Sequence, residues 1–269
     1  TIAGDASFTS TGNVTDSGAI AVTGNASFQG TAITLGDSST ANFGSIDFVG
    51  TGAVTVSESS ATTVSGTSSA GAGLTLTSSS DVALDGAVTV TGNTIITAGS
   101  TTGDIDVNAK LTGSGTILLD AGGSITIDAA VDPTTVTLEA DDDITINAAV
   151  VADNLITVTA GLDGTGSVTL DGTAPETGSL TTSAAGSDIA ITTGVTAGSI
   201  TLDGNVTTLD RLTLTSGSTG AITQPSGTLL SANLQVTGTG AVTLNQATND
   251  FATIAADLNP GDFSLTDAN

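Results

Sequence analysis

The chain reads Ser-Ile-Thr-Ile-Asp-Ala-Ala at residues 124–130 and, 19 residues later, Asp-Ile-Thr-Ile-Asn-Ala-Ala at residues 143–149. Within each copy isoleucine alternates with threonine, so apolar side chains point to one side and polar side chains to the other. β-Branched residues also favour extended backbone, because they pack well on a pleated surface. Each copy therefore predicts a short, half-buried β-strand.

Small and polar residues follow these strands. An acidic or amide residue comes directly after the alternating run, and Ala or Gly follows it, as at Asp128-Ala129, Asn147-Ala148 and Asp203-Gly204. These residues favour tight turns, since Asp and Asn bond to their own backbone and Gly accepts left-handed conformations. Because a three-residue strand has no core of its own, the units must stack on one another like the coils of a β-solenoid.

Two series of apolar residues recur at spacings of 19 to 24 residues. The first series is Ile33, Val54, Leu74, Ile95, Ile117, Val136, Ile156, Leu180, Ile200, Ile222, Val242 and Phe263. The second series is Ile105, Ile125, Ile144, Val168, Ile189, Leu212, Leu234 and Ile254. Two series predict at least two strands per coil, and a third, weaker face would make the cross-section triangular. We expect an all-β parallel β-helix of about thirteen coils, about 60 Å long at ~4.8 Å per coil, in which residues 1–269 form a single continuous array.

Two further columns of residues are predicted by the same spacing. Phe8, Phe28 and Phe48 recur every 20 residues, which predicts an internal ladder of offset aromatic rings. A corner column is predicted from Asn108, Asp128, Asn147, Asp171, Thr192, Thr215, Thr237 and Asp257. No two acids are neighbours in that series, so Asn is expected to bond to Asp along the column where adjacent carboxylates would repel.

The composition excludes several classes of partner. The net charge is −25, and Lys110 and Arg211 are the only cations. Nucleic acids and anionic membrane surfaces require a basic footprint, so neither is an expected partner. No apolar run approaches the ~18 residues of a membrane span. The acidity is interpreted as a coat that keeps otherwise adhesive particles apart.

Residue types that support catalysis are missing. The chain has no His, Tyr or Cys. It therefore lacks the residues of most general-base schemes, of nucleophilic triads and of thiolate metal sites. We therefore predict that the protein is not an enzyme and assign no catalytic, cofactor-binding or metal-binding residue. Asp141-Asp142-Asp143 is the densest acidic cluster and offers oxygen ligands for Ca²⁺, but a solvated acidic corner is the favoured interpretation. Asn13, Asn25 and Asn205 begin glycosylation triplets, which are frequent by chance in a chain rich in Ser and Thr.

Prolines mark the places where the pattern loosens. Pro133 lies between two predicted strands, and Thr173–Thr177 and Gln224-Pro225-Ser226 are predicted outward loops or bent corners, because Pro cannot donate to a ladder.

Thr-x-Thr pairs suggest an ice-binding surface: Thr75/Thr77, Thr89/Thr91, Thr157/Thr159 and Thr213/Thr215. These pairs skip turns and fall in both series, so no continuous array is expected from them.

Four stretches, Gly122–Ala130, Gly240–Ala247, Asn249–Phe251 and Gly261–Asn269, resemble the repeats of filamentous-haemagglutinin-type exoproteins and of giant bacterial β-strand-repeat surface proteins. The resemblance extends over the whole chain and rests on composition more than on motifs. It implies a right-handed parallel β-helix, export to the outside of a Gram-negative-type cell, and a role as adhesin shaft or extracellular fibre. The family's secretion domain, with its Asn-Pro-Asn-type motif, has no counterpart here, and Asn259-Pro260-Gly261 is interpreted as a corner.

Thr1-Ile2 and Phe263–Leu265 are typical of strands inside an array and not of caps. Uncapped strands offer unpaired backbone, so we expect the chain to join copies of itself end to end or to be part of a longer solenoid. The main functional prediction is a structural extracellular protein, a fibre or adhesin stalk on a bacterial surface. One alternative is an adhesin that binds a receptor or glycan through its lateral surface, for example at the loop 172–178. The other is an ice-binding solenoid.

Overall fold

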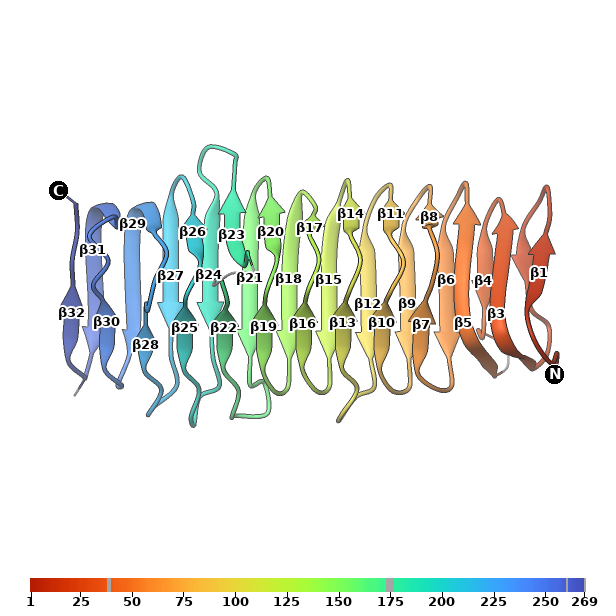
Figure 1. The fold of residues 1–269 in the computed structure, drawn as a ribbon, viewed down its shortest axis with the longest axis horizontal. Helices are drawn as coiled ribbons and strands as arrows, with labels where there is room; N and C mark the ends of the chain where they lie inside the picture. The colour runs from red at the N-terminus through yellow and green to blue at the C-terminus, as the bar shows by residue number, and fades with distance from the viewer. Residues whose placement is uncertain (38–39, 173–176, 260, 269) are drawn as a thin grey trace. The chain divides into compact units, whose positions relative to one another are not determined.

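The computed structural model describes residues 1–37, 40–172, 177–259 and 261–268. The protein is an all-β parallel β-solenoid of about 13 turns, with no helix among the described residues (Figure 1). The predicted fold class is therefore confirmed.

The chain divides into two compact units, Thr1–Gly123 and Ser124–Asn269, which we call unit 1 and unit 2 and describe separately. A single array over residues 1–269 stays a prediction. The described residues contain no helix with the length and apolarity needed to span a membrane.

Unit 1 begins with strands that differ in length. These are β1 (Ala6–Thr9), β2 (Val14–Thr15), β3 (Ile20–Gly30), β4 (Ile33–Leu35) and β5 (Ala41–Gly50). Three stacks of strands follow, one per side of the coil. The long face has β6 (Val54–Glu58), β9 (Leu74–Ser78), β12 (Thr94–Ala98) and β15 (Thr116–Ala121). The short face has β7 (Thr62–Val64), β10 (Val82–Leu84) and β13 (Ile105–Val107), and the third face has β8 (Ser68–Ala70), β11 (Val88–Val90) and β14 (Leu111–Gly113).

Unit 2 has the same three faces in every coil. Its long face has β18 (Thr135–Ala140), β21 (Leu155–Ala160), β24 (Asp188–Thr192), β27 (Arg211–Thr215) and the second halves of β29 (Leu229–Gly238) and β31 (Asp250–Leu258). Its short face has β16 (Ile125–Ile127), β19 (Ile144–Ile146), β22 (Val168–Leu170), β25 (Ile200–Leu202), β28 (Ile222–Thr223), β30 (Val242–Leu244) and β32 (Phe263–Leu265). Its third face has β17 (Val131–Asp132), β20 (Ala149–Ala152), β23 (Ser179–Thr182), β26 (Asn205–Thr207) and the first halves of β29 and β31.

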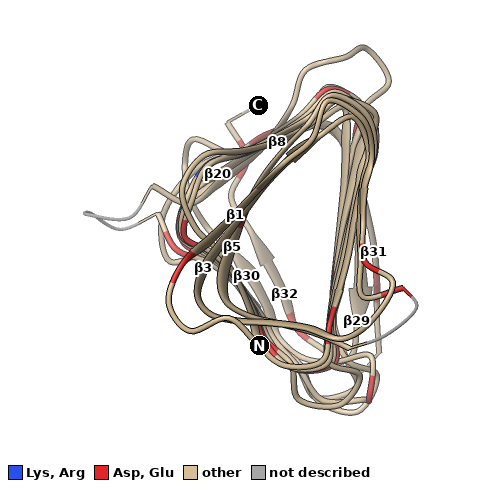
Figure 2. Cartoon of the chain, turned by 90° about the vertical axis from the view of Figure 1, so that its right-hand side faces the viewer, with Lys and Arg blue, Asp and Glu red and all other residues tan. Residues whose placement is uncertain are grey.

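The central repeat lies in register. Ile125, Thr126 and Ile127 of β16 pair in parallel with Ile144, Thr145 and Ile146 of β19. The isoleucines are fully buried and the threonines between them face outward. Seen along the coils, each turn is a three-sided loop with Asp and Glu gathered mainly at its bends (Figure 2). The third face, only suggested by the sequence, is thus a regular part of the coil.

The predicted register of the aromatic ladder of unit 1 is confirmed, and ring stacking is confirmed for Phe8 and Phe28. Phe8 pairs with Phe28 and Phe28 pairs with Phe48 along β1, β3 and β5. The rings of Phe8 and Phe28 stack with centroids 4.8 Å apart and planes 9° apart. Phe43, which the spacing did not include, meets Phe28 edge-on at 5.5 Å. The ladder therefore has a lateral member from the first half of β5.

The inward position predicted for Ile95 in the first series is wrong. Leu74 and Ile117 both pair with Thr94, whereas Ile95 pairs with Thr75 and is 41% exposed. Strand β12 begins one residue earlier than the apolar pattern suggests, so Ile96 points inward and Ile95 outward. The inward position that apolar residues hold in the neighbouring strands is here a buried threonine.

In unit 2 the later members of each predicted series pair with earlier members of the other series. Ile156 pairs with Ile189 and not with Leu180, and Val168 pairs with Ile200. Leu180 pairs with Val150 on the third face. One coil is therefore longer than the predicted 19 to 24 residues: the stacked residues Ser167 and Ser199 are 32 positions apart. The extra residues lie in the three connections of this coil, from β22 to β23, from β23 to β24 and from β24 to β25, because a corner can lengthen without breaking a ladder.

The predicted corner column is wrong after Asp171 for the same reason. Thr192, Thr215, Thr237 and Asp257 pair in register on the long face, whereas the corner column passes from Asp171 to Asp203. Two acids are thus neighbours there, contrary to expectation. The predicted bonding between Asn and Asp is confirmed elsewhere: Asn108 Nδ2 donates to Asp85 Oδ1 at 2.8 Å, and Asn147 Nδ2 donates to Asp128 Oδ1 at 2.7 Å.

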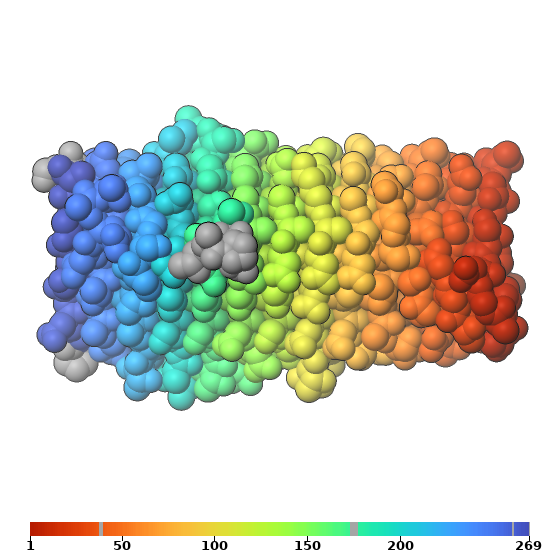
Figure 3. Space-filling view, in the orientation of Figure 1, coloured from red at the N-terminus to blue at the C-terminus, as the bar shows by residue number. Residues whose placement is uncertain are grey.

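The proline-containing segments lie between strands where they are described. Pro133 separates β17 from β18, and Gln224-Pro225-Ser226 connects β28 to β29. Residues 173–176, predicted to form a loop, and Pro260, in the predicted corner at 259–261, lie outside the described residues. On the face shown in Figure 3, successive coils place their side chains in parallel rows.

Candidate functional site

The acidic cluster at Asp141-Asp142-Asp143 is a corner between β18 and β19. Asp143 Oδ1 accepts a hydrogen bond from the backbone N–H of Ser167 at 2.7 Å, and the Asp142 carbonyl accepts one from Gly161 N–H. Throughout the described part of the chain, no group of three acidic side chains is placed to hold a metal ion. These residues therefore offer no converging ligand set for Ca²⁺.

The glycosylation triplet at Asn25 is part of a hydrogen-bond network in unit 1. Asn25 Nδ2 donates to Asp47 Oδ2 at 2.6 Å, and Asn25 Oδ1 accepts from Ser45 Oγ and Ser65 Oγ, each at 2.8 Å. Ser27 Oγ donates to the second oxygen of the same Asp47 carboxylate at 2.7 Å. The amide nitrogen that a glycan would occupy thus joins successive coils.

Glu58 is the buried acid of unit 1. Its side chain is 4% exposed, and Glu58 Oε1 accepts a hydrogen bond from Phe43 N–H at 2.7 Å. The Thr62 hydroxyl lies beside this carboxylate. Burial raises the pKa of the Glu58 carboxyl to about 7, against the smaller opposing effects of hydrogen bonds from the Phe43 amide and the Thr62 side chain. We interpret Glu58 as a structural group, because its carboxylate is enclosed in the core and bonded to the backbone.

A continuous column of hydroxyl side chains runs along the short face of unit 2. Each member is the outward residue of a two- or three-residue strand and pairs in register with the next. We call this set the threonine column; it consists of Thr126, Thr145, Thr169, Thr201, Thr223, Thr243 and Ser264. The expectation stated above concerned Thr-x-Thr pairs and does not include this column, in which each strand contributes only one outward residue.

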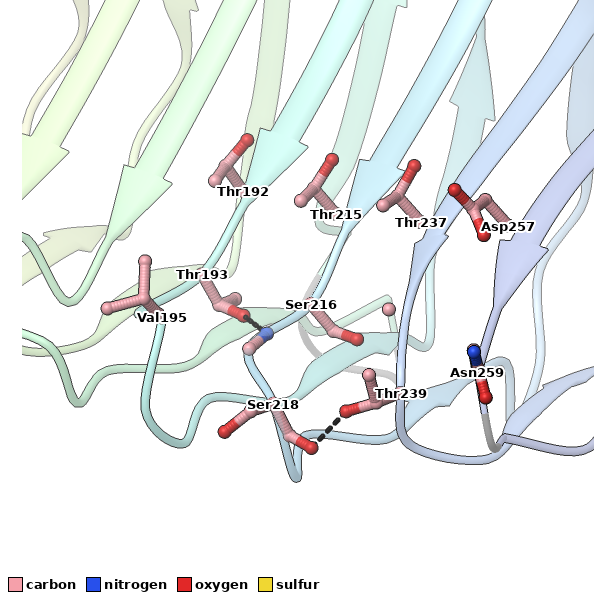
Figure 4. A pocket seen from close by; sticks show the side chains of 12 residues that line it. Thr192, Thr193, Val195, Thr215, Ser216, Ser218, Thr237, Thr239, Asp257 and Asn259 are labelled. Atoms are coloured by element: carbon pink, nitrogen blue, oxygen red, sulfur yellow. Dashed lines mark hydrogen bonds between the residues drawn. The ribbon is translucent and has the colours of Figure 1, made fainter.

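A groove of about 380 Å³ lies where the long face of unit 2 meets the following bend (Figure 4). We call it the hydroxyl groove. Its lining is Thr192, Thr193, Val195, Thr215, Ser216, Gly217, Ser218, Thr237, Gly238, Thr239, Asp257 and Asn259. Thr192, Thr215 and Thr237 form a row in register, with their hydroxyls on the same side, and Asp257 ends the row.

Hydrogen bonds hold the bend below this row. Thr193 Oγ1 donates to the Gly198 carbonyl at 2.8 Å and accepts from Gly217 N–H at 3.2 Å. Thr239 Oγ1 donates to the Ser218 carbonyl (Figure 4). These contacts tie the loops of three successive coils together, so the floor of the hydroxyl groove is preformed.

Ser216 is the exception among these polar groups. Its side chain is 7% exposed, and Ser216 Oγ has no hydrogen-bond partner among the described residues. An unpaired buried hydroxyl is rare in native structures, because it has lost its water without gaining a partner. Gly238 lies against it, and a Cβ at that position would collide with Ser216 Oγ.

The rim of the hydroxyl groove combines an apolar and an acidic group. Val195 projects from the bend with 80% of its surface exposed, although valine is usually buried. Asp257 is exposed at the other end of the row. Neither cation lines the groove, and Arg211 instead lies 3.8 Å from Asp188. The hydroxyl groove therefore offers hydroxyl donors and acceptors, one apolar contact and one carboxylate.

Sequence reasoning found part of this site. The 20-residue spacing placed Thr192, Thr215, Thr237 and Asp257 in one column, which the pairing confirms, but assigned that column to the wrong corner. Val195, Ser216 and Gly238 were not singled out. The available signal was weak: Val195 is an isolated apolar residue among Gly, Thr and Ala.

The comparisons with known proteins match only the beginning of the chain. A family model described as repeats of unknown function, DUF5649, matches residues 1–48. The matched segment contains β1 to β4 and most of β5, including the aromatic ladder. The comparison with curated protein sequences and the comparison with solved structures each find no match.

Proposed function

We propose that this protein is a structural extracellular protein, which forms a fibre or the stalk of an adhesin on a bacterial surface. The observation that carries the proposal is the uninterrupted parallel pairing from coil to coil within each unit. In unit 2, for example, β18, β21, β24 and β27 pair in turn along the long face. The resemblance of the repeats to exported filamentous proteins supports the same role.

The mechanism of such a protein is mechanical. Parallel backbone hydrogen bonds run along the coil axis on three faces, so an axial load is shared by many bonds acting together. Fully buried Ile, Val and Leu side chains hold the faces together from inside. The acidic surface keeps neighbouring molecules apart, because like charges repel within a Debye length.

The proposal includes a location and a partner. The protein acts outside the bacterial cell, and its partner is a further solenoid coil, supplied by a copy of the chain or by a longer polypeptide. The repeat resemblance and the stacking of coils support both. The composition, with no Cys, two cations and a net charge of −25, supports a partner other than nucleic acid or an anionic membrane.

Immunogold electron microscopy on the producing bacterium tests this function. Antibodies against the chain should label filaments or projections on intact cells, and protease treatment of intact cells should remove the label. A cytoplasmic protein of the same cells should survive the protease and serves as the control. Label confined to the cell interior would refute the proposal.

Ice binding is a second candidate function, which the threonine column favours. Its members stack ~4.8 Å apart, a regular spacing of hydroxyl and methyl groups that can order water. Thermal hysteresis of the full chain should be measurable and should disappear in Thr201→Lys. Thr213→Lys, on the long face, is the matched control. An absence of hysteresis in the unmodified chain would exclude this candidate.

A further inference from the structure

We propose that the hydroxyl groove of unit 2 binds a neutral oligosaccharide. The inference deepens the surface role proposed above, since it gives the stalk a lateral ligand. It rests on the row of hydroxyls, the unpaired Ser216 hydroxyl, the exposed Val195 and the acidic environment, which are argued in turn below.

The row of threonines presents repeated hydrogen-bonding groups. Thr192, Thr215 and Thr237 lie ~4.8 Å apart along the coil axis, and each hydroxyl can donate one bond and accept two. A sugar chain carries hydroxyls with the same dual capacity at similar intervals. A linear oligosaccharide lying along the axis can therefore bond to successive coils.

Ser216 provides an independent sign of a ligand. It lines the groove directly after Thr215, and its hydroxyl lacks a partner among the described residues. A hydroxyl of a sugar bound in the groove can supply the missing hydrogen bond. Gly238 leaves the space for this contact, because any larger residue would press on the Ser216 hydroxyl.

The remaining groups select among sugars. Val195 offers an exposed apolar surface, against which the C–H face of a sugar ring can pack. Asp257 lies at the end of the row, and the chain carries a net charge of −25. This field repels sulfated and carboxylated sugars. A neutral chain of hexoses fits both features.

The groove is also suited to binding by its rigidity. Thr193 and Thr239 fix the bend through hydrogen bonds to Gly198 and Ser218. A preformed site loses little conformational freedom when a ligand binds. Its volume of about 380 Å³ falls within the usual range of small-molecule sites.

Isothermal titration calorimetry of the full chain with neutral hexose oligomers tests the inference. The probes are β-linked and α-linked glucose and galactose trimers, and the sulfated form of each trimer is its anionic control. At least one neutral trimer should bind, and its sulfated form should bind at least tenfold more weakly. If none of the neutral trimers binds, or if the sulfated form binds as well, the inference is overturned.

Substitutions locate the binding. Thr215→Val, Ser216→Ala and Gly238→Ala should each weaken binding at least tenfold. Thr213→Val, two residues earlier on β27 and equally placed on the outer side of the long face, should change it less than twofold. Equal effects of Thr213→Val and Thr215→Val would show that the ligand lies elsewhere and would overturn the assignment.

Folding measured in parallel separates a binding defect from a structural one. Ser216→Ala removes an unpaired buried hydroxyl, so its thermal midpoint should equal or exceed that of the unmodified chain while its binding falls. A lowered midpoint together with unchanged binding would overturn the role given to Ser216. None of these outcomes bears on whether the protein forms surface fibres, which the labelling experiment decides alone.

Discussion

Glu58 and Thr94 are two of the buried polar side chains of unit 1, together with Thr62, Ser68 and Ser78. Glu58 ends β6, and one oxygen of its buried carboxylate accepts a hydrogen bond from Phe43 N–H. Thr94 begins β12, fully buried between Leu74 and Ile117, and its hydroxyl has no hydrogen-bond partner among the described residues. Both residues carry a desolvation cost, so both are places where a single substitution has a definite sign.

The pH dependence of stability should follow Glu58. Its pKa is raised in the folded chain to about 7, so the folded state binds more protons than the unfolded state between about pH 4.5 and pH 7. The contribution of Glu58 to stability is thus fully present below this window and is lost as the pH rises through it. Denaturant unfolding at pH 5 and pH 8 should show a loss on the order of 1–3 kcal/mol that Glu58→Gln abolishes. Other carboxylates are common to both proteins, so parallel pH profiles would contradict the assignment.

Thr94→Val should stabilise the protein. Valine has nearly the shape of threonine and removes a buried hydroxyl that has no partner, so the free energy of unfolding should rise by roughly 1 kcal/mol. Thr97→Val, on the same strand but facing outward, is the matched control and should change it by less than half as much. Urea titration of the three proteins gives the comparison, and a destabilised Thr94→Val would mean that the hydroxyl is bonded.

Each strand of this protein is held by the strands that pair with it in the neighbouring coils. The aromatic ladder on β1, β3 and β5 is the clearest case. Phe28 is buried between Phe8 and Phe48 along the pairing and touches Phe43 at its edge. The loss of its ring would leave a cavity, because the pairing of β3 with β1 and β5 holds the backbone around it in place.

Phe28→Ala should therefore be among the most damaging single changes in unit 1. We expect a loss of about 3–5 kcal/mol in the free energy of unfolding, the usual cost of truncating a buried Phe. Phe8→Ala should cost less, because Phe8 is only half-buried and stacks on one ring. Chemical denaturation followed by far-ultraviolet circular dichroism measures both, and an equal loss for the two variants would contradict the ladder argument.

The sequence predicts the individual strands better than it predicts how they pair. All three faces present an apolar residue, a polar residue and an apolar residue, so the pattern identifies strands but not the face on which each lies. Ile189 was therefore placed after Val168, although it pairs with Ile156. The hydroxyl groove shares this limit: spacing predicts its row of threonines, but only the pairing of the coils places Ser216 and Val195 beside that row.

Charge acts on the molecule as a whole. A net charge of −25, with acidic side chains mainly at the bends, gives a repulsive surface around an apolar interior. The repulsion is screened by salt, with a Debye length of about 8 Å at physiological ionic strength and about 3 Å at 1 M. Assembly of such particles is therefore sensitive to ionic conditions.

Salt and acid should both promote association. At neutral pH and low salt, light scattering should report dispersed particles, and the scattered intensity should rise in 1 M NaCl or near pH 4, where carboxylates become protonated. A matched osmolality of sucrose should have no such effect, since it leaves the charges unscreened. Scattering that is independent of both salt and pH would show that the acidic coat does not control association.

The sequence by itself determined the strands, the corners and the stacking of Ile125 on Ile144, because alternation and turn residues act over a few neighbouring positions. The tertiary structure alone decided which coil is 32 residues long, that Thr94 and not Ile95 points inward, and that Ser216 is left unpaired in a groove. The physical reason is that parallel pairing depends on residues far apart in the chain. A corner absorbs extra residues at little cost, so local spacing does not fix which strands meet.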